Sequence, residues 1–571
     1  MKTIKRVLSL LLVLAVVISS LAGCNRQNLR KTQPGNEEPQ ASQSDRKPTE
    51  PPEPEVPEEL LPMSFAYTLT DQDEEDSLAL VRELGTHIES GDNEKIISAA
   101  DRLQEKVDYL SHQYLIAEIK YYSDLEDDEA YDNYVISEDA YLRVREETLR
   151  VLKILYETDL SAKENIFEDW TDAQIKELAF SEETTALQKE RSDLEREYLA
   201  LDDSAGTWSA EVEEIYCKFV NSGRQLATLY GYDNYYDYAA NEIYMRKYSE
   251  EQRASFRENV KEKLLPFYLE VDASYQEKRS QLTEEQKDLR YALRYDPCLE
   301  SNEYLAGYIS SYPEEMKTIM NHLFDRNAVV YTESPNAHGV AYTGYSEYCD
   351  QPFVFLGKGV QDLMTVVHEL GHYTAYYHFN DAQLPYDTCE VHSQGNEWLF
   401  VHYLDGKIDP KVYEVFLLHR LRIGLQIVIM STLVDEYEEQ VYNSGEISSP
   451  GAFKTIMNAV LDNYPGIEAF ATRESIYNYA QHVQIETPVY YLSYATSELA
   501  SILFYTVAEE EGYIAAQKIY TDLCLKTPVD KVFFDTLSDV GLPDPFAVET
   551  VEKIMDAFDD FQGENALQPA A

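Results

Sequence analysis

Apolar side chains recur at every third or fourth position along most of the chain. The pattern is clear in DSLALVRELGTHIES, in the stretch that begins at Asn93, between residues 209 and 286, and from Val412 onward. On an α-helix this spacing gathers apolar side chains on one face, which must then pack against another element. Stretches such as SGD, SSPG and YPG mark turns between the helical segments. The pattern predicts a mainly α-helical protein.

One segment, residues 327–359, breaks this pattern. It reads NAVVYTESPNAHGVAYTGYSEYCDQPFVFLGKG, in which β-branched and aromatic residues are separated by clusters of Gly, Pro and Asn. Short runs of this kind between turn signals predict two or three short strands. We therefore expect two helical regions, residues 62–205 and 206–565, arranged around a small sheet.

The first 61 residues do not share the helical pattern. Lys2, Lys5 and Arg6 precede an apolar run that is short for a membrane span, which is typical of an export signal over residues 1–24. The sequence LAGC at its end resembles the bacterial lipobox, and this resemblance implies lipidation of the Cys24 thiol. Residues 25–61 are rich in Pro, Glu, Gln and Ser, a composition that predicts a disordered tether. We expect a protein anchored by acyl chains outside the cytoplasmic membrane.

Composition narrows the range of partners. The 571 residues carry 48 basic and 104 acidic side chains, and the resulting net charge of −56 repels phosphate backbones. Nucleic acid is therefore excluded as an expected partner. Beyond Cys24, the remaining cysteines include no CxxC pair and are odd in number, so we expect mostly free, buried thiols.

The stretch VVHELGHYTAYYHF contains a zinc-protease signature. His368 and His372 are four residues apart, which places them about 40° apart on one face of a helix, within reach of one metal ion. Glu369 lies beside them, where a carboxylate can take a proton from water and return it to a leaving amine. The stretch predicts a site for one Zn²⁺ ion that still lacks its third protein ligand.

His378 is one candidate for that ligand. It has the spacing of the metzincin pattern H-E-x-x-H-x-x-G-x-x-H, in which a glycine ends the helix and brings the third histidine back. Here Ala375, a strong helix former, stands at the glycine position, and a continued helix turns His378 about 120° away from His372. We therefore expect that His378 is not a ligand.

Glu390 is the other candidate. It lies eighteen residues after the second histidine in DTCEVHSQGNEWLFVHYL, a segment with helical periodicity that Asp387 or Thr388 can cap. From a second helix it completes a His2Glu ligand set with one position open for water. Glu397, about two turns further on the same face, can hydrogen-bond a ligand histidine, whereas His392 lies on another face and is expected to pack.

Three blocks together resemble the oligoendopeptidase F and thimet oligopeptidase family of zinc metallopeptidases. They are TVVHELGH, EVHSQGNEW and HVQIETPVYYLSYATSELAS, within roughly residues 331 to 500. The resemblance implies a two-lobed helical body with a deep central channel and a small β-sheet beside the active-site helix. It also implies hydrolysis of internal bonds in short unfolded peptides. From the third block, it implies that an oxyanion is stabilised by a histidine and a tyrosine among His482, Tyr490, Tyr491 and Tyr494, and it leaves open which tyrosine donates.

Upstream, AHGVAYTGY resembles the edge strand that pairs with the substrate backbone, which places His338, Gly339 and Ala341 near the cleft. We expect a monomeric zinc endopeptidase that binds short peptides. Two other functions fit the same sequence. A carboxypeptidase or dipeptidase of related fold would need a basic residue for the terminal carboxylate. A lipid-anchored peptide-binding protein without turnover would be expected to lack Glu369.

Overall fold

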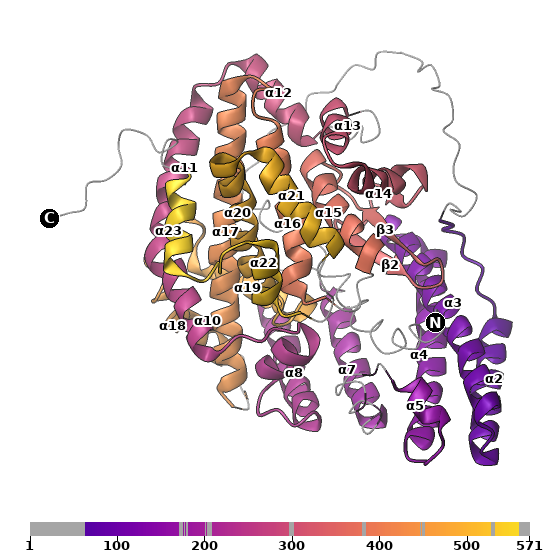
Figure 1. The fold of residues 1–571 in the computed structure, drawn as a ribbon. Helices are drawn as coiled ribbons and strands as arrows, with labels where there is room; N and C mark the ends of the chain where they lie inside the picture. The colour runs from indigo at the N-terminus through magenta and orange to yellow at the C-terminus, as the bar shows by residue number, and fades with distance from the viewer. Residues whose placement is uncertain are drawn as a thin grey trace.

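The computed structural model describes residues 63–168, 181–199, 208–295, 302–379, 384–445, 451–526 and 531–558, together with residues 170, 175, 178, 201 and 447. The predicted export signal and tether, including Cys24, lie outside these ranges. Most of the described chain is helical, and its strands form one small sheet (Figure 1). The prediction of a mainly α-helical protein with a small sheet is confirmed.

The first helical region has a core of its own. It comprises α2 Asp71–Ser90, α3 Asn93–Ser123, α4 Asp128–Tyr156 and α5 Ala162–Ile166, whereas Leu194 and Tyr198 of the next helix, α7 Ser181–Leu199, are buried in the second core described below. Asp92 and Asp127 accept hydrogen bonds from backbone N–H groups in the first turns of α3 and α4, which fixes where these helices begin. Leu84, Leu103 and Leu149 are among the apolar side chains buried between α2, α3 and α4. These helices form one side of the molecule, at the indigo end of the colour scale (Figure 1).

The larger part of the molecule follows residue 208 and is built around a second apolar core. Before the sheet it contains α8 Trp208–Leu229, α9 Tyr235–Tyr238, η3 Ala239–Ile243, α10 Glu250–Asn259, η4 Val260–Leu264, α11 Leu265–Ser280, α12 Glu284–Tyr295, α13 Glu303–Ser310 and α14 Glu314–Asp325. After the sheet it contains α15 Leu363–Phe379, α16 Tyr386–Tyr403, α17 Pro410–Asn443, α18 Gly451–Leu461, η7 Ile467–Ala469, α19 Arg473–Glu486, α20 Leu492–Glu511, α21 Tyr513–Lys526, α22 Phe533–Val540 and α23 Val548–Asp556.

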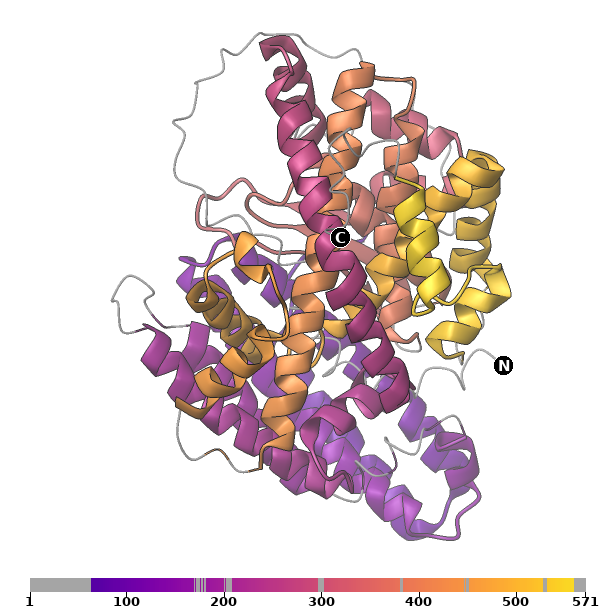
Figure 2. The same ribbon diagram turned by 90° about the vertical axis from the view of Figure 1, so that its left-hand side faces the viewer.

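The longest helix, α17, passes through this second core. Asp409 caps its first turn and Pro410 starts it. Within the described ranges, α17 is the one helix long and apolar enough to cross a membrane, but 72% of its apolar window is buried inside the protein. It packs against α11 and α20, and Figure 2 shows α11 in front of α17. Its apolar character is therefore explained by burial in the core.

Three strands form the sheet, as predicted for residues 327–359. β3 Gln351–Leu356 lies in the middle, parallel to β1 Val329–Tyr331 and antiparallel to β2 Ala341–Ser346. Because side chains alternate along a strand, the sheet has two different faces. Ala341 belongs to the core that includes α15, whereas Tyr342 packs against the end of α3. The sheet thus lies between the helix that carries HELGH and the first helical region.

The described cysteines Cys217, Cys349, Cys389 and Cys524 are free thiols, and the last two are buried. The prediction of free thiols is confirmed for these four residues, whereas the predicted burial holds for Cys389 and Cys524 and only partly for Cys217 and Cys349.

Candidate active site

The helices α15 and α16 pack against each other and carry the HELGH and EVHSQGNEW segments. α15 continues through Ala375 to its end at Phe379, so the turn that the metzincin pattern requires at this position is not made. Gly371 lies where the two helices come closest, because a Cβ atom there would overlap the backbone carbonyl of His392. The glycine of HELGH therefore allows α16 to approach the two histidines. His392 itself is fully buried, as its predicted packing role requires.

His368, His372 and Glu390 converge on one point. One ligand atom from each lies within 4.8 Å of the other two. Oε2 of Glu390 is 3.7 Å from Nε2 of His368 and 3.6 Å from Nε2 of His372. Two ligands of a tetrahedral zinc ion with bonds of about 2.1 Å lie roughly 3.4 Å apart, so these separations fit that ion. The three residues predicted as ligands form a group that can hold a metal.

The burial of this group also suits a cation. Burial lowers the pKa of His372 well below its usual value, and the neighbouring His368 and His392 act in the same direction. A neutral imidazole is the form that binds metal ions. Burial raises the pKa of Glu390, because a carboxylate is costly to keep charged in an apolar environment without a nearby positive charge. A metal ion would supply that charge.

Glu369, the predicted proton acceptor, is held by the sheet. The hydroxyl of Thr343 donates to Oε2 of Glu369 at 2.7 Å and lies 3.1 Å from its backbone carbonyl oxygen. Thr343 is in β2, and its side chain points to the same face as Ala341, toward α15. The strand edge therefore orients the carboxylate. Thr343 could not be singled out from the sequence, because a threonine in a strand carries no sign of which side chain it will contact.

The hydrogen bond expected between Glu397 and a histidine of this group is present. Oε1 of Glu397 lies 2.7 Å from Nδ1 of His368, and Oε2 forms an ion pair of 3.0 Å with Nε of Arg420. Arg420 also donates two hydrogen bonds, of 2.7 and 2.8 Å, to Glu498. Trp398 also donates to Glu498, at 2.9 Å. A chain of buried charges thus continues from His368 into the core between α16, α17 and α20.

Arg420 and Glu498 were not predicted as parts of the site. Glu498 is the one charged residue in LSYATSELASILFY, and Arg420 lies in the apolar stretch VFLLHRLRIGLQIVIM. Charged residues at buried helical positions are nearly always paired. A charge within each of two apolar helices was therefore an available sign of a buried ion pair.

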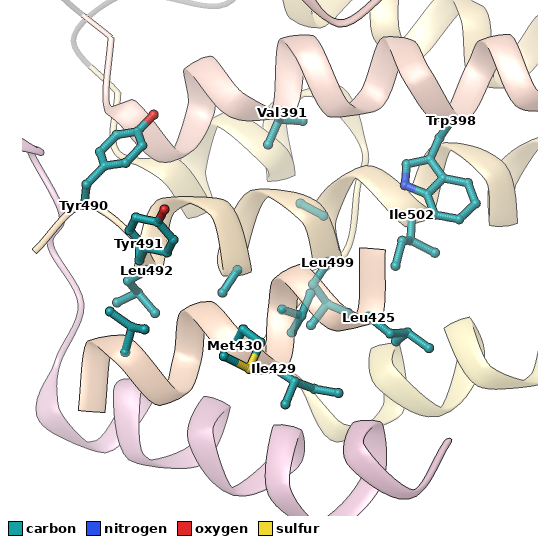
Figure 3. Packing of buried hydrophobic residues seen from close by; sticks show 14 of the residues in the cluster. Val391, Trp398, Leu425, Ile429, Met430, Tyr490, Tyr491, Leu492, Leu499 and Ile502 are labelled. Atoms are coloured by element: carbon teal, nitrogen blue, oxygen red, sulfur yellow. The ribbon is translucent and has the colours of Figure 1, made fainter. Parts of the chain in front are cut away.

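The three predicted tyrosines lie together at the start of α20. The hydroxyl of Tyr490 donates to Oε1 of Glu390 at 2.6 Å, and the hydroxyl of Tyr491 accepts from that of Tyr479 at 3.2 Å. The ring of Tyr494 meets the rings of Tyr490 and Tyr491 edge-on, with centroid distances of 4.9 and 5.5 Å. Figure 3 shows Tyr490 and Tyr491 just before the apolar face of α20. His482 lies in α19, and its side chain is outside the described structure.

The expected helix cap at Asp387 or Thr388 is wrong. α16 begins at Tyr386, after Pro385, so both residues are already inside its first turn. Asp387 is buried and accepts hydrogen bonds from the hydroxyls of Tyr248, Ser493 and Thr496. Its carboxylate joins α16 to the start of α20 instead of capping a helix.

In the predicted substrate strand, His338 is bonded to the end of α3, whereas Ala341 lies in β2 at the open edge of the sheet. The N–H of His338 donates to the carbonyl of Tyr122 at 2.8 Å, and the two rings stack with centroids 4.8 Å apart. Gly339 lies between this contact and β2. The N–H of Gly357, in the loop after β3, donates to the carbonyl of Val340. By the alternation of an antiparallel pair, Ala341 turns its own N–H and C=O away from β3, toward the open edge of the sheet.

Solved structures share the fold of this chain. A Bacillus anthracis protein described as an oligoendopeptidase F has a TM-score of 0.64 and 15% identity, over 87% of this chain and 97% of that chain. The chain has the fold of these peptidases. PZ peptidase A, solved with an inhibitor, gives a TM-score of 0.61 at 15% identity over 87% and 100% of the two chains. Oligoendopeptidase F from Enterococcus faecium gives 0.52 at 14% identity over 87% and 98%. No protein-family model matches the sequence, and no curated protein matches it significantly.

Proposed function

We propose that the protein is a zinc-dependent endopeptidase that hydrolyses internal bonds of short unfolded peptides. The observation that carries this proposal is the buried group of His368, His372 and Glu390, with Glu369 on the same helix as the two histidines. The likeness in fold to oligoendopeptidase F structures supports it. Two imidazole nitrogens and one carboxylate oxygen form a ligand set that zinc uses in peptidases, with one position left open.

When bound, zinc would supply a Lewis acid that makes water acidic and polarises a peptide carbonyl. Glu369 then takes the proton of the attacking water and delivers it to the leaving nitrogen. Thr343 keeps the carboxylate of Glu369 in one orientation through its 2.7 Å hydrogen bond. Glu397 accepts the Nδ1 proton of His368, which fixes the tautomer whose Nε2 lone pair would be free to bind the metal.

The tyrosines divide between two tasks in this proposal. Tyr490 donates to Oε1 of Glu390, so that Oε2 faces the two histidines. Tyr491 and Tyr494, with His482, are left to donate hydrogen bonds to the oxyanion that forms on the scissile carbonyl. Of these, Tyr491 has a hydroxyl oxygen that accepts a hydrogen bond from the hydroxyl of Tyr479, which fixes its position.

The edge of β2 is the proposed binding surface for the peptide backbone. An extended peptide can pair with the outward N–H and C=O groups of Ala341, next to the Thr343 that holds Glu369. Most of the backbone of a folded protein is already paired and cannot add to a strand edge, which accounts for a preference for unfolded peptides. His338 and Gly339 would border this surface, with the His338 backbone already bonded to α3.

Export and anchoring through Cys24 are part of the same proposal, with the monomer acting on peptides outside the cytoplasmic membrane. A Cys24→Ser variant should then leave the membrane fraction.

Metal dependence tests the proposal directly. A chelator should abolish cleavage of a peptide blocked at both ends, and stoichiometric Zn²⁺ should restore it, whereas Mg²⁺ should not. A blocked peptide excludes carboxypeptidase and dipeptidase action, because those enzymes need a free terminus. Cleavage that is unaffected by complete metal removal would overturn the proposal, and cleavage of unblocked peptides alone would replace it with an exopeptidase.

A further inference from the structure

Two residues with strained backbone angles are joined by one buried side chain near His368, His372 and Glu390. Among the described residues, four that are not glycine have positive φ: Met245, Asn327, Asp350 and Val489. Asn and Asp adopt this conformation readily, whereas Met and especially β-branched Val do so at a cost. The unexpected positions are therefore Met245, at φ 53°, and Val489, at φ 63°. Such strain persists where the surroundings enforce it, and it is concentrated at functional sites.

Arg246 makes the contact between these positions. Its Nη1 donates to the carbonyl of Val489 at 2.7 Å, and its Nη2 donates to the carbonyl of Tyr490 at 2.7 Å and to the hydroxyl of Ser493 at 2.6 Å. Its Nε forms a 3.0 Å hydrogen bond to Asp387. One buried guanidinium thus joins the first turn of α16, the helix of the carboxylate ligand, to residues 487–491, which we call the tyrosine segment.

Glu438 of α17 holds the tyrosine segment from another side. Its Oε1 accepts the backbone N–H of Val489 at 2.7 Å, and the hydroxyl of Tyr244 donates to the carbonyl of Pro488 at 2.6 Å. Burial raises the pKa of Glu438 well above its usual value. A neutral carboxylic acid and a glutamine amide offer the same acceptor oxygen, so Glu438→Gln preserves the bond to Val489. Four backbone groups at and beside the strained residue are therefore bonded to buried side chains: the N–H of Val489 and the carbonyls of residues 488, 489 and 490.

We propose that Arg246 and Glu438 are positioning residues that hold Val489 in the left-handed conformation and thereby place Tyr490 against Glu390. A valine released from this conformation returns to the extended region, and the chain after it then takes another direction. The hydroxyl of Tyr490 would no longer reach Glu390, and Tyr491 would leave its position beside Tyr479. The kinetic part of this inference rests on the proposed peptidase function, but the conformational part does not.

The strain itself supplies the test. Glycine adopts left-handed backbone angles as readily as right-handed ones, so Val489→Gly lowers the cost of the conformation that Glu438 enforces. If Glu438 acts through Val489, the glycine should compensate for its loss. If Glu438 merely stabilises the core, a change at Val489 should not compensate.

The experiment compares full-length wild type, Glu438→Gln, Glu438→Leu, and Glu438→Leu combined with Val489→Gly. A second combination, Glu438→Leu with Asn327→Gly, is the matched control, because Asn327 also has positive φ but lies before β1. We expect Glu438→Leu to lower kcat for a quenched peptide by about tenfold or more with little change in KM. Val489→Gly should recover about fivefold or more of that loss. Glu438→Gln should retain most of kcat, and Asn327→Gly should recover nothing.

Hydrogen–deuterium exchange of the peptide covering residues 487–495 gives a readout that needs no activity. Exchange should be faster in Glu438→Leu and slower again when Val489→Gly is added. A wild-type kcat in Glu438→Leu, or no recovery with Val489→Gly, overturns the inference. If the wild type cleaves no peptide, the peptidase proposal fails. The positioning inference is then tested by exchange alone, and equal hydrogen–deuterium exchange in wild type and Glu438→Leu would overturn it. If Glu438→Leu does not fold, Tyr244→Phe, which removes one hydroxyl from the same segment, takes its place with the same expectations.

Discussion

Oε1 of Glu390 accepts a hydrogen bond from the hydroxyl of Tyr490 at 2.6 Å, while Oε2 of the same carboxylate faces the Nε2 atoms of His368 and His372. The tyrosine thus determines which oxygen of Glu390 turns toward the two histidines. Tyr490→Phe removes this hydrogen bond and keeps the ring, so we expect zinc affinity to fall about tenfold or more. Competition with a chromophoric chelator measures it. Tyr491→Phe is the matched control, since it should lower kcat and leave zinc affinity unchanged. A Tyr490→Phe variant with normal zinc affinity would show that Tyr490 does not support the ligand.

Thr343 and Glu369 give a second prediction. Replacing the hydroxyl by a methyl group in Thr343→Val leaves the carboxylate without its 2.7 Å donor. Hydrogen bonds to charged groups contribute about 1.5–3 kcal/mol, so we expect kcat to fall by about tenfold or more while zinc content stays the same. Thr343→Ser keeps a hydroxyl and should retain most of the activity. Equal activity of the valine and serine variants would mean that the sheet does not orient Glu369.

The close approach of α15 and α16 at Gly371 gives a third prediction. In Gly371→Ala the new methyl group overlaps the carbonyl of His392 and must push α15 and α16 apart. We expect a loss of about 1–3 kcal/mol in the free energy of unfolding, together with weaker zinc binding. Urea unfolding and zinc titration measure the two effects. Gly85→Ala in α2 is the control, because its methyl group would meet Val151 at an ordinary 3.9 Å. A Gly371→Ala protein with wild-type stability and zinc binding would contradict the tight helix contact.

A fourth prediction concerns pH. Glu118 is buried on the α3 side of the sheet. Burial, and to a smaller extent the charges of Glu138 and Glu195, raise its pKa to about 8, although the hydrogen bond from Tyr342 acts in the opposite direction. The folded protein therefore keeps a proton that the unfolded chain releases near its ordinary pKa of 4.5. This contribution to stability is fully present below that lower pKa and is lost as pH rises toward 8.

Glu118→Gln stays neutral at every pH. Its melting temperature should therefore fall less than that of the wild type between about pH 5 and pH 8. Parallel curves for the two proteins would show that Glu118 is ionised in the folded state.

The secondary structure was largely readable from the sequence because periodicity is a local property. The helices before residue 295 and after residue 363 follow three- and four-residue apolar spacing, and the three strands lie where β-branched and aromatic runs replace it. The deep channel and the two lobes came from family resemblance and remain predictions. The predicted helix cap at Asp387 was wrong. Aspartate is preferred at helix starts, but the carboxylate of Asp387 instead bonds Arg246, which lies 141 residues away in the sequence.

The group of His368, His372 and Glu390 was predictable for a related reason. His368 and His372 are brought together by one helix, and Glu390 and Glu397 are two turns apart on the next. Thr343, Arg246 and Glu438 were missed because tertiary packing alone brings them to the site. The charge of Arg420 within an apolar helix indicated a buried ion pair but not its partner. The left-handed backbone at Val489 had no signal at all, since valine is among the least expected residues in that conformation.

The most direct test of a zinc endopeptidase is cleavage of a quenched fluorescent peptide, blocked at both ends and long enough to pair along the edge of β2. Wild type, Glu369→Gln and Glu390→Ala are compared, with zinc content determined for each. We expect Glu369→Gln to keep its zinc and lose turnover, and Glu390→Ala to lose both. A wild-type protein that is loaded with zinc and binds the peptide, yet never cleaves it, would contradict the enzyme function and identify a peptide-binding protein instead.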